Sequence, residues 1–396
     1  MIRPHRLPAM LLACWLLLAF AAPTVQAQQG HSLPPMATPA AATVGDGWRI
    51  ADVQALDNRT TPVALSPDGQ WIAGIDEEDR FCVWDAATLE PTCDAGDLTI
   101  HPESIAWAPD STAVAWSLDA FRLIVESDIY VFEVATGKSV NLTNDEVPGE
   151  EHAQQYITSS TIDVMPTWSR DSRSITFARA AGSPDQPGTT LMTIPRSGGE
   201  PEPRHTVAQE APLSIATLMF HLSDGSLLYA VTSTSDHPEQ GLWLLEVNGA
   251  ARQILPGRGM PVIADVVETE NGTLISGFSL PAIFQLGPDE PFSFVLELES
   301  GEMTPLVHPD DETTLLYPAG FSPGGSSTIS VTWNPLVLPA VVVLGPEVSE
   351  TPLPESVDIA HGSLALQRAP DWVGNNTILV SGFSNGAFLI TVEPVT

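Results

Sequence analysis

Short apolar runs alternate with polar turns along most of the chain, and one kind of turn recurs throughout it. Its first copy is LSPDGQWIA, residues 65–73, in which apolar residues flank a turn built on Asp68 and Gly69. Asp-Gly and Asn-Gly pairs favour two-residue hairpin turns because they tolerate positive φ. Similar turns follow at intervals of roughly 50 residues. The matched turn residues are Asp68, Asp110, Asp171, Asp224, Asn271, Gly324 and Asn375.

A second hairpin follows most copies of this turn, as in DIYVFEVATGKSVNLT at residues 128–143. Each repeat therefore supplies four short strands, and helical periodicity is nearly absent. The pattern predicts an all-β fold, a β-propeller of four-stranded antiparallel blades. We expect seven blades, or six if the divergent fifth repeat does not form one. Because the last repeat is one strand short, the segment WRIADVQAL, residues 48–56, is expected to complete the final blade and close the ring.

The SPDG turns and the segment IYVFEVATGKSVNLT, residues 129–143, resemble the propeller repeats of TolB-type periplasmic proteins. The tripeptide VWD at residues 83–85 resembles the end of a WD repeat. This resemblance covers about residues 47–396 and implies a propeller. It implies little about activity, because one architecture hosts many functions. We expect a propeller without the N-terminal α/β domain of TolB, so the role of TolB in envelope assemblies does not transfer.

Residues 1–27 have the pattern of an export signal, in which basic residues precede an apolar stretch and a small-residue cleavage motif, VQA. An uncleaved membrane anchor and a lipid-modified Cys14 are the alternatives. Residues 28–45, rich in Ala, Pro and Thr, are expected to form a flexible linker, and residues 46–396 the propeller domain. The predicted location is extracytoplasmic, secreted or periplasmic, with an N-terminal anchor if the signal is not cleaved.

Acidic residues dominate the charge of the chain. The 49 acidic residues outnumber the 15 basic ones, and the formal net charge is −34. Such a surface repels phosphate backbones and anionic lipid headgroups, so nucleic-acid binding and membrane binding by the propeller itself are not expected. A basic protein, a small ligand or a cation suits it better. Solubility alone is the simpler interpretation of the charge.

Two cysteines remain once the signal and its Cys14 are removed. Aligning FCVWDAATLEPTC, residues 81–93, on the hairpin IYVFEVATGKSVN places Cys82 directly opposite Cys93. A disulfide within the first blade is therefore expected, as in proteins of oxidising compartments. Two free thiols are the alternative.

Two Gly-x-Ser-x-Gly motifs, centred on Ser322 and Ser384, raise the question of serine hydrolysis. A nucleophile elbow requires a strand, a turn and a helix, followed in the chain by an acid and a histidine. No histidine follows Ser384, and Ser322 sits in the repeated turn with no strand-helix alternation around it, so we expect no catalytic residue at either position. Three tryptophans before the repeated turn are expected to pack between blades, rather than to stack on sugars or bases. They are Trp107, Trp168 and Trp372.

In propellers the repeated turns lie on one face and the variable loops on the other, where binding usually occurs. The predicted binding residues of those loops are Glu150, Glu151, His152, Asp185, Asp236, His237, Phe284, Asp310 and Asp311. Such oxygens suit Ca²⁺ as a cofactor. However, the sequence has no EF-hand, HExxH or paired-cysteine pattern, so no metal site is assigned.

These patterns predict a non-enzymatic exported propeller that binds a protein or a small ligand through its variable face. The alternative is an extracytoplasmic propeller enzyme, a lyase or lactonase with a metal at the channel mouth. Few histidines occur at the predicted starts of the innermost strands, which favours binding. The sequence identifies neither the partner nor an activity.

Overall fold

The fold is described from a computed structural model of the whole chain. The described residues are 48–56, 61–94, 100, 104–118, 127–144, 161–181, 189–207, 215–232, 238–256, 261–279, 293–310, 314–333, 340–345, 348–352, 370–374, 376–381 and 387–394. Among them, no helix is long and apolar enough to cross a membrane. The predicted signal and linker lie outside the described residues.

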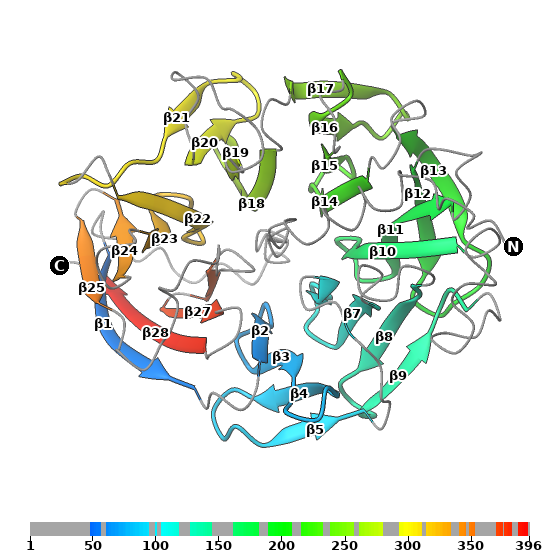
Figure 1. Cartoon of the computed structure of the whole chain (residues 1–396), viewed down its shortest axis with the longest axis horizontal. Helices are drawn as coiled ribbons and strands as arrows, with labels where there is room; N and C mark the ends of the chain where they lie inside the picture. Colours follow the sequence, from blue (N-terminus) through cyan, green and yellow to red (C-terminus); the bar gives the residue numbers. More distant parts are fainter. Residues whose placement is uncertain are drawn as a thin grey trace, which may run out of the picture.

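Seven four-stranded sheets stand around a central axis as the blades of a propeller (Figure 1). In blades 1 to 6 the strands follow chain order from the axis outward, and neighbouring strands are antiparallel. Blade 1 holds β2 (Thr61–Leu65), β3 (Trp71–Ile75), β4 (Phe81–Asp85) and β5 (Pro91–Cys93). Blade 2 holds β6 (Ala106–Trp107), β7 (Ala113–Ser117), β8 (Ile129–Glu133) and β9 (Lys138–Asn141). Blade 3 holds β10 (Thr161–Trp168), β11 (Ser174–Ala181), β12 (Thr189–Pro195) and β13 (Glu202–Val207).

The remaining blades continue this order around the ring. Blade 4 holds β14 (Ile215–His221), β15 (Leu227–Thr232), β16 (Gly241–Leu245) and β17 (Ala251–Pro256). Blade 5 holds β18 (Pro261–Thr269), β19 (Gly272–Ser279), β20 (Ser293–Glu297) and β21 (Met303–Pro305). Blade 6 holds β22 (Leu315–Phe321), β23 (Thr328–Trp333), β24 (Ala340–Leu344) and β25 (Ser349–Pro352). Blade 7 holds β26 (Asp371–Val373), β27 (Thr377–Ser381), β28 (Ala387–Pro394) and, from the start of the chain, β1 (Trp48–Ala55).

The all-β fold and the seven blades are thus confirmed, and the six-blade alternative is wrong because the divergent fifth repeat forms a complete sheet. The expected ring closure is also confirmed. Strand β1 pairs with β28 from Trp48, opposite Pro394, to Ala55, opposite Phe388. The Ile50 N–H also donates a hydrogen bond to Ser349 Oγ of blade 6, at 3.1 Å. The N-terminal strand therefore holds the last blade to its neighbour as well as completing it.

The recurring turn joins the first and second strands of the blades. In blade 1 the Asp68 carboxylate accepts hydrogen bonds from the Ser66 hydroxyl, at 2.6 Å, and from the Gln70 amide, at 3.0 Å. The acidic residue therefore accepts hydrogen bonds from donors within its own turn, a hydroxyl and a backbone amide. The residue after it takes a positive φ, which glycine adopts without strain. In the described turns this positive φ occurs at Gly69, Ser111, Ser172, Gly225, Gly272 and Gly325, whereas in the last repeat it occurs at Gly374, one residue before the matched Asn375.

The two serines in that series link neighbouring blades. Ser111 Oγ accepts a hydrogen bond from the Asp68 amide, and Ser172 Oγ accepts one from the Asp110 amide, both at 3.1 Å. Both serines are buried and have a φ of 60°. Glycine would relieve the backbone strain, but it could not make this contact. The turns of blades 1, 2 and 3 are therefore tied to one another in order.

The predicted role of the tryptophans is confirmed. Trp107 and Trp168 are 2% and 0% exposed. The Trp107 indole donates to the Ala64 carbonyl of blade 1 at 3.1 Å, and the Trp168 indole donates to the Ala106 carbonyl of blade 2 at 3.0 Å. Trp372 is also buried and meets the ring of Trp48 edge-on, with the ring centroids 5.4 Å apart. Trp107 and Trp168 therefore bind neighbouring blades to each other, and Trp372 packs in the core that blades 6 and 7 share. These buried rings leave no surface on which a sugar or base could stack.

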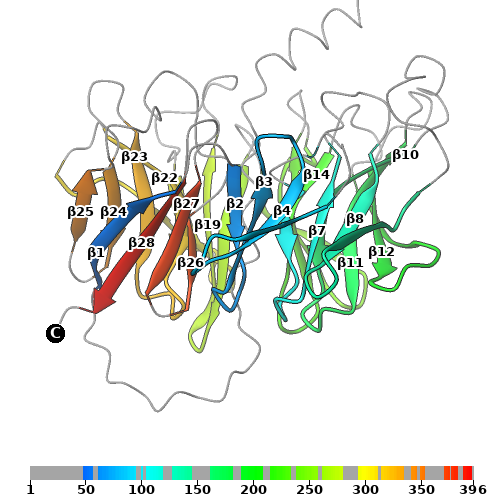
Figure 2. The ribbon, with the colours of Figure 1, turned by 90° about the horizontal axis from the view of Figure 1, so that it is seen from below.

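The ring has two unlike faces. The turn face carries the β2–β3 and β4–β5 connections and their counterparts, which form the tight hairpins at the lower edge of Figure 2. The loop face is the opposite end, where the innermost strands begin, and it faces the viewer in Figure 1. Longer connections join strand ends at the loop face, as the sequence predicted. They lie outside the described residues and include 119–126, 145–160, 182–188, 233–237 and 280–292.

Blades 6 and 7 approach each other closely at Gly320, in the first of the two Gly-x-Ser-x-Gly motifs. A Cβ atom on Gly320 would lie 2.2 Å from the Pro370 carbonyl oxygen. Ser322 of the same motif is 1% exposed, and its Oγ accepts a hydrogen bond from the Ser327 amide at 3.1 Å. Packing and turn geometry therefore account for this motif. Ser384 lies outside the described residues.

The predicted register of the cysteines is confirmed. Cys82 of β4 lies opposite Cys93 of β5, with 1.98 Å between the two sulfur atoms and 4.0 Å between the Cα atoms. The Asp94 amide donates to the Phe81 carbonyl at 2.9 Å, immediately outside the pair. The hairpin register alone thus brings the thiols together.

Candidate functional site

One of the predicted binding residues, Asp310, lies within the described residues. It is exposed beyond the end of β21, and its amide donates to His308 Nδ1 at 3.2 Å. His308 is buried, and its Nε2 atom lies 3.4 Å from Glu350 of blade 6. His308 therefore links two blades, and Asp310 stays exposed at the loop face. The others lie outside the described residues and stay predictions: Glu150, Glu151, His152, Asp185, Asp236, His237, Phe284 and Asp311.

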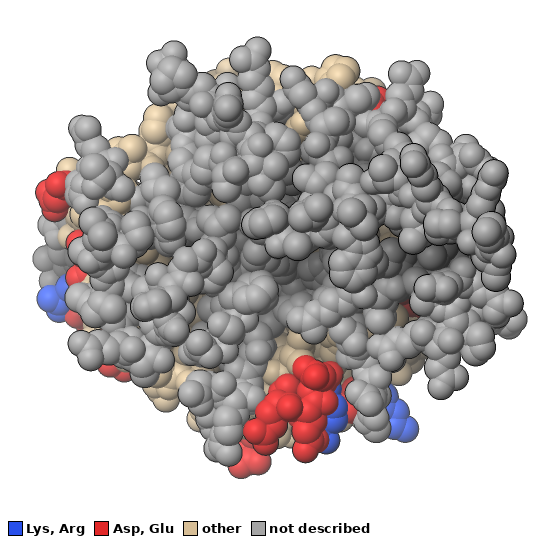
Figure 3. All heavy atoms as spheres, in the orientation of Figure 1, with Lys and Arg blue, Asp and Glu red and all other residues tan. Residues whose placement is uncertain are grey.

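Blade 1 adds an acidic run to the loop face. Asp76 is followed by Glu77, Glu78 and Asp79 in the β3–β4 connection, and the last three are exposed. Figure 3, which views this face, shows acidic side chains gathered over blade 1. We did not predict this group from the sequence, although four consecutive acids between two strands are a readable signal. It forms part of the candidate site.

One arginine balances part of the acidic run. Arg80 lies 2.7 Å from the Asp76 carboxylate and 3.0 Å from the Glu78 carboxylate. Burial raises the pKa of Asp76, but the hydrogen bonds from Arg80 outweigh this effect and hold that pKa below its usual value. Among the described residues, Glu77 and Asp79 have no cationic partner. These two carboxylates are therefore available for a ligand.

The other described arginine at the loop-face ends of the strands is Arg179, on β11. Its guanidinium donates two hydrogen bonds of 2.7 Å to the carboxylate of Asp163, on β10. The Asp163 side chain is fully buried, whereas that of Arg179 is 24% exposed. Burial raises the pKa of Asp163, although the hydrogen bonds from Arg179 oppose that rise. This arginine is thus engaged inside the ring and offers little positive charge to a ligand.

A polar cluster beside this pair joins blades 2 and 3. The Asn141 amide group donates to the Asp128 carboxylate at 2.7 Å, and the Thr143 hydroxyl donates to it at 3.2 Å. The Thr143 hydroxyl also acts to lower the pKa of Asp163 in the next blade. The cluster fixes the strand ends from which residues 145–160 depart, the segment that carries three of the predicted binding residues.

Two further carboxylates, each on the innermost strand of its blade, accept hydrogen bonds from backbone amides of the following blade. Asp265 of blade 5 accepts hydrogen bonds from the amides of Phe321, in blade 6, and Val266, both at 2.8 Å. Asp371 of blade 7 accepts a hydrogen bond from the Leu65 amide of blade 1 at 3.0 Å. These two acids hold neighbouring blades together.

The buried carboxyl of Asp265 predicts a pH dependence of stability. Burial raises the pKa of Asp265 to about 8, from an ordinary value of 3.8 for an aspartate. The folded state therefore favours the neutral carboxyl of Asp265. The stability that Asp265 contributes is fully present below about pH 4 and is lost as the pH rises through about 8. Asparagine cannot titrate, and it loses one acceptor oxygen. We expect the melting temperature of Asp265→Asn to lie below that of the wild type at low pH, with a gap that narrows towards about pH 8.

The control for this prediction is Asp171→Asn. A hydrogen bond from the Ser169 hydroxyl lowers the pKa of Asp171, which is exposed on the turn face, so its pH dependence has the opposite sign. Melting curves recorded by circular dichroism across this pH range compare the two variants. A constant gap for Asp265→Asn would contradict this interpretation of the buried Asp265 carboxyl.

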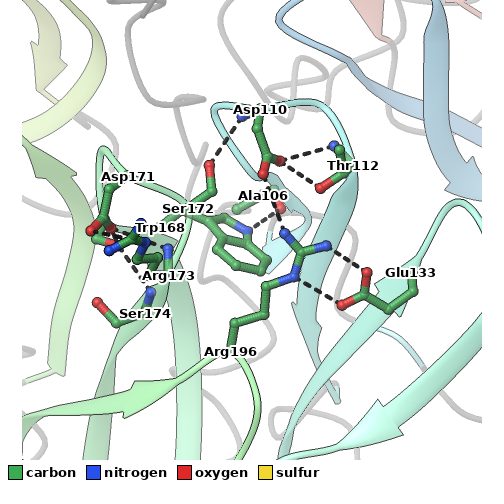
Figure 4. A network of polar contacts seen from close by, with 11 residues as sticks. Ala106, Asp110, Thr112, Glu133, Trp168, Asp171, Ser172, Arg173, Ser174 and Arg196 are labelled. Carbon is green, nitrogen blue, oxygen red and sulfur yellow. Dashed lines mark hydrogen bonds and ion pairs between the residues drawn. The ribbon is translucent and has the colours of Figure 1, made fainter.

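The turn face of blades 2 and 3 carries a network centred on Arg196 (Figure 4). Arg196 donates to Glu133 at 2.9 Å and to Asp110 at 3.3 Å, and it lies over the Trp168 ring, 5.6 Å from the centroid. An open groove of about 610 Å³ adjoins it, lined also by Asp171, Ser172, Arg173 and Ser197. Its charges are of both signs and largely paired, so the groove favours no particular ligand. We therefore interpret the network as structural: it joins blade 2 to blade 3.

The described residues give little support to a metal centre. Among them, one group of histidine, cysteine or acidic side chains is close enough to share an ion, namely Asp76, Cys82 and Cys93. The two sulfur atoms are at bonding distance from each other, and Asp76 is held by Arg80. Among the described innermost strands, the acids discussed above are engaged by amides or by arginine. A Ca²⁺ site in the loops stays a prediction.

The comparisons with known proteins agree with the fold. No protein-family model matches the chain, and no curated protein matches its sequence. Among solved structures, oligogalacturonate lyase from Vibrio parahaemolyticus has a TM-score of 0.58 at 10% identity, over 87% of this chain and 98% of the lyase. An oligogalacturonate lyase in complex with manganese has a TM-score of 0.57 at 13% identity, over 93% and 99%. At these identities the likeness shows a shared propeller fold and nothing of the activity.

Two TolB structures are also similar. TolB from Acinetobacter baumannii has a TM-score of 0.43 at 13% identity, over 85% of this chain and 64% of TolB. Putative TolB from Agrobacterium tumefaciens has a TM-score of 0.43 at 14% identity, over 65% and 88%. The propeller that the TolB resemblance implied is seen directly in the seven sheets of this chain.

Proposed function

We propose that the protein is a non-enzymatic binding scaffold that works outside the cytoplasm and holds a cationic protein, peptide or small ligand on its loop face. One observation carries the proposal. At the loop-face ends of the described strands, Arg80 and Arg179 are both engaged by carboxylates, whereas Glu77, Asp79 and Asp310 are exposed. The charge left for a partner on the described part of this face is therefore negative.

The architecture supports the same interpretation. Tight hairpins join the strands at the turn face, whereas the strand ends that the longer connections join lie at the loop face. These connections carry most of the predicted binding residues, and the polar cluster around Asp128 and Asp163 gives them a rigid base. Rigid scaffolds with variable loops at one end are a common arrangement for binding.

An extracytoplasmic location belongs to the proposal. It rests on the signal pattern at residues 1–27 and on the pairing of Cys82 with Cys93 at bonding distance, which suits an oxidising compartment. Mass spectrometry of the exported protein tests both points. It should show a mature chain that begins at Gln28 and carries no free thiol.

The binding proposal predicts that a fluorescent oligolysine peptide binds the mature chain and that binding weakens with salt. Glu77→Gln combined with Asp79→Asn should weaken binding about fivefold, at roughly 0.5 kcal/mol for each charge removed. Asparagine tolerates the positive φ of Asp79, so this variant should fold. Fluorescence anisotropy at two salt concentrations measures the effect.

The matched control is Glu200→Gln combined with Glu202→Gln, which removes the same charge from exposed positions at the turn face. Equal losses in the two double variants would mean that net charge alone attracts the peptide, and would contradict a loop-face site. So would the absence of binding at low salt.

The alternative is the propeller enzyme, a lyase or lactonase with a channel-mouth metal. What favours it is that two of the similar structures are oligogalacturonate lyases, one of them in complex with manganese. What opposes it is the engagement of Asp163, Asp265 and Asp371 within the ring. Melting the same chain with Mn²⁺, Ca²⁺ or EDTA separates the two functions. A large shift with Mn²⁺ would favour the enzyme, whereas the scaffold predicts no shift with Mn²⁺; a shift with Ca²⁺ alone would fit the loop Ca²⁺ site predicted for the scaffold.

A further inference from the structure

Of the three Asn-Gly pairs of the chain, two lie on hairpin turns of the turn face, in neighbouring blades, and the third, Asn385–Gly386, lies outside the described residues. Asn248–Gly249 lies in the turn after β16 of blade 4. Asn271–Gly272 lies at the turn between β18 and β19, the first two strands of blade 5. Both asparagines are exposed. The same dipeptide is therefore present in two similar settings, where the surroundings can be compared.

The side chain of Asn248 is held at both ends. Its Nδ2 donates to the Glu246 carboxylate at 3.0 Å, and its Oδ1 accepts from the Ala250 amide at 2.8 Å. The Gly249 amide donates to the Glu246 carbonyl at 2.9 Å. Rotation of the Asn248 side chain towards the Gly249 nitrogen would break two hydrogen bonds.

The side chain of Asn271 has no such restraint. Its backbone amide donates to Thr269 Oγ1 at 3.2 Å, but its side-chain amide forms no hydrogen bond with any described residue. Gly272, with a φ of 136°, has no Cβ to hinder approach to its nitrogen. The Asn271 side chain is therefore free to sample the rotamers that its turn allows.

We propose that Asn271–Gly272 is a site of spontaneous covalent modification, and that Asn248–Gly249 is protected from it. The Gly272 backbone nitrogen bonds to Asn271 Cγ, and the bond from Cγ to Nδ2 breaks. Ammonia leaves with the proton that Gly272 gives up, which closes a five-membered imide. Water then opens either carbonyl–nitrogen bond of the imide, and the product is aspartate or isoaspartate. No oxidant or enzyme is needed.

The modification adds a negative charge to a turn that is already acidic. Glu270 precedes Asn271, and the Glu299 carboxylate accepts a hydrogen bond from the Thr273 amide at 2.9 Å. An isoaspartate would also lengthen the backbone of a two-residue turn closed by Thr269 opposite Gly272. We therefore expect the modified protein to bind more tightly to an anion exchanger and to melt at a lower temperature.

The test is to incubate the folded mature protein in mildly alkaline buffer and to follow both peptides by mass spectrometry. The peptide with Asn271 should gain the mass of an amide-to-acid conversion well before the peptide with Asn248 does. The guanidinium-unfolded chain is the control, because there the two rates should become similar. Asn271→Gln should remove the early acidic product.

Two results would overturn the proposal. One is conversion of Asn248 in the folded protein as fast as that of Asn271. The other is an unchanged Asn271 under conditions that convert it in the unfolded chain. Neither result concerns ligand binding at the loop face, so this proposal is tested independently of the proposed function.

Discussion

A mature chain that starts at residue 57, and so lacks β1, is expected not to fold cooperatively. Strand β1 supplies the fourth strand of blade 7 and buries Trp48, Ile50 and Val53 against the core shared with blade 6. Partial burial of three such side chains contributes on the order of 5 kcal/mol, at about 1.5 to 3 kcal/mol for each one fully buried. This is comparable with the whole stability of a typical domain, about 5 to 15 kcal/mol.

Loss of β1 also exposes β28 as an edge strand, which invites association between chains. Circular dichroism melting and size-exclusion chromatography should therefore show a lost or broadened transition together with oligomers. The control is Arg49→Ala, because Arg49 is exposed and pairs only at the surface with Glu393. It should change stability by less than about 1 kcal/mol. A monomeric truncated chain with an unchanged transition would contradict the closure role of β1.

Trp168→Ala is expected to lower the free energy of unfolding by about 3 to 5 kcal/mol, the usual cost of emptying a large core site. Trp168 is fully buried in the cluster that joins blades 2 and 3. Its indole donates to the Ala106 carbonyl, and Arg196 lies over its ring. The substitution would thus remove packing, a hydrogen bond between blades and a cation–π contact at one place.

Trp168→Phe separates these contributions. It keeps an aromatic ring in the core but removes the indole N–H, so the Ala106 carbonyl loses its partner across the blade boundary. An intermediate loss is expected, with about 1 to 3 kcal/mol from the unsatisfied buried carbonyl. Urea unfolding followed by circular dichroism gives both values. A Phe variant as unstable as the Ala variant would mean that ring burial contributes little.

The fold was predictable because its signals are local and repeated. Most of the turns place a positive φ directly after a polar residue, and this requirement is visible at Asp68–Gly69 and again at Asp224–Gly225. The register of Cys82 and Cys93 followed from the length of one hairpin. Closure by the segment at residues 48–56 followed from counting the strands of the last repeat.

The contacts between blades were not predictable, because they join residues far apart in the chain. Nothing near Asp265 in the sequence indicates that its carboxylate accepts the Phe321 amide of the next blade. By contrast, Asp163 and Arg179 lie opposite each other within one hairpin, so the register of that hairpin could have predicted their pairing.

The candidate site was only partly predictable. Composition indicated an acidic face, and Asp310 is exposed on it. The run at Asp76–Asp79 was missed because the turn between the second and third strands of blade 1 is short, whereas the prediction concentrated on long loops. Its charge, and not its length, was the useful signal.

The most direct test of the account is a cross-link between the two ends of the chain. Arg49 of β1 lies opposite Glu393 of β28, and their side chains form an exposed ion pair. In Arg49→Cys combined with Glu393→Cys, oxidation should form a disulfide within one chain, seen as a monomer that migrates faster without reductant. Free thiols, or bridges only between chains, would contradict a ring closed by its N-terminal strand.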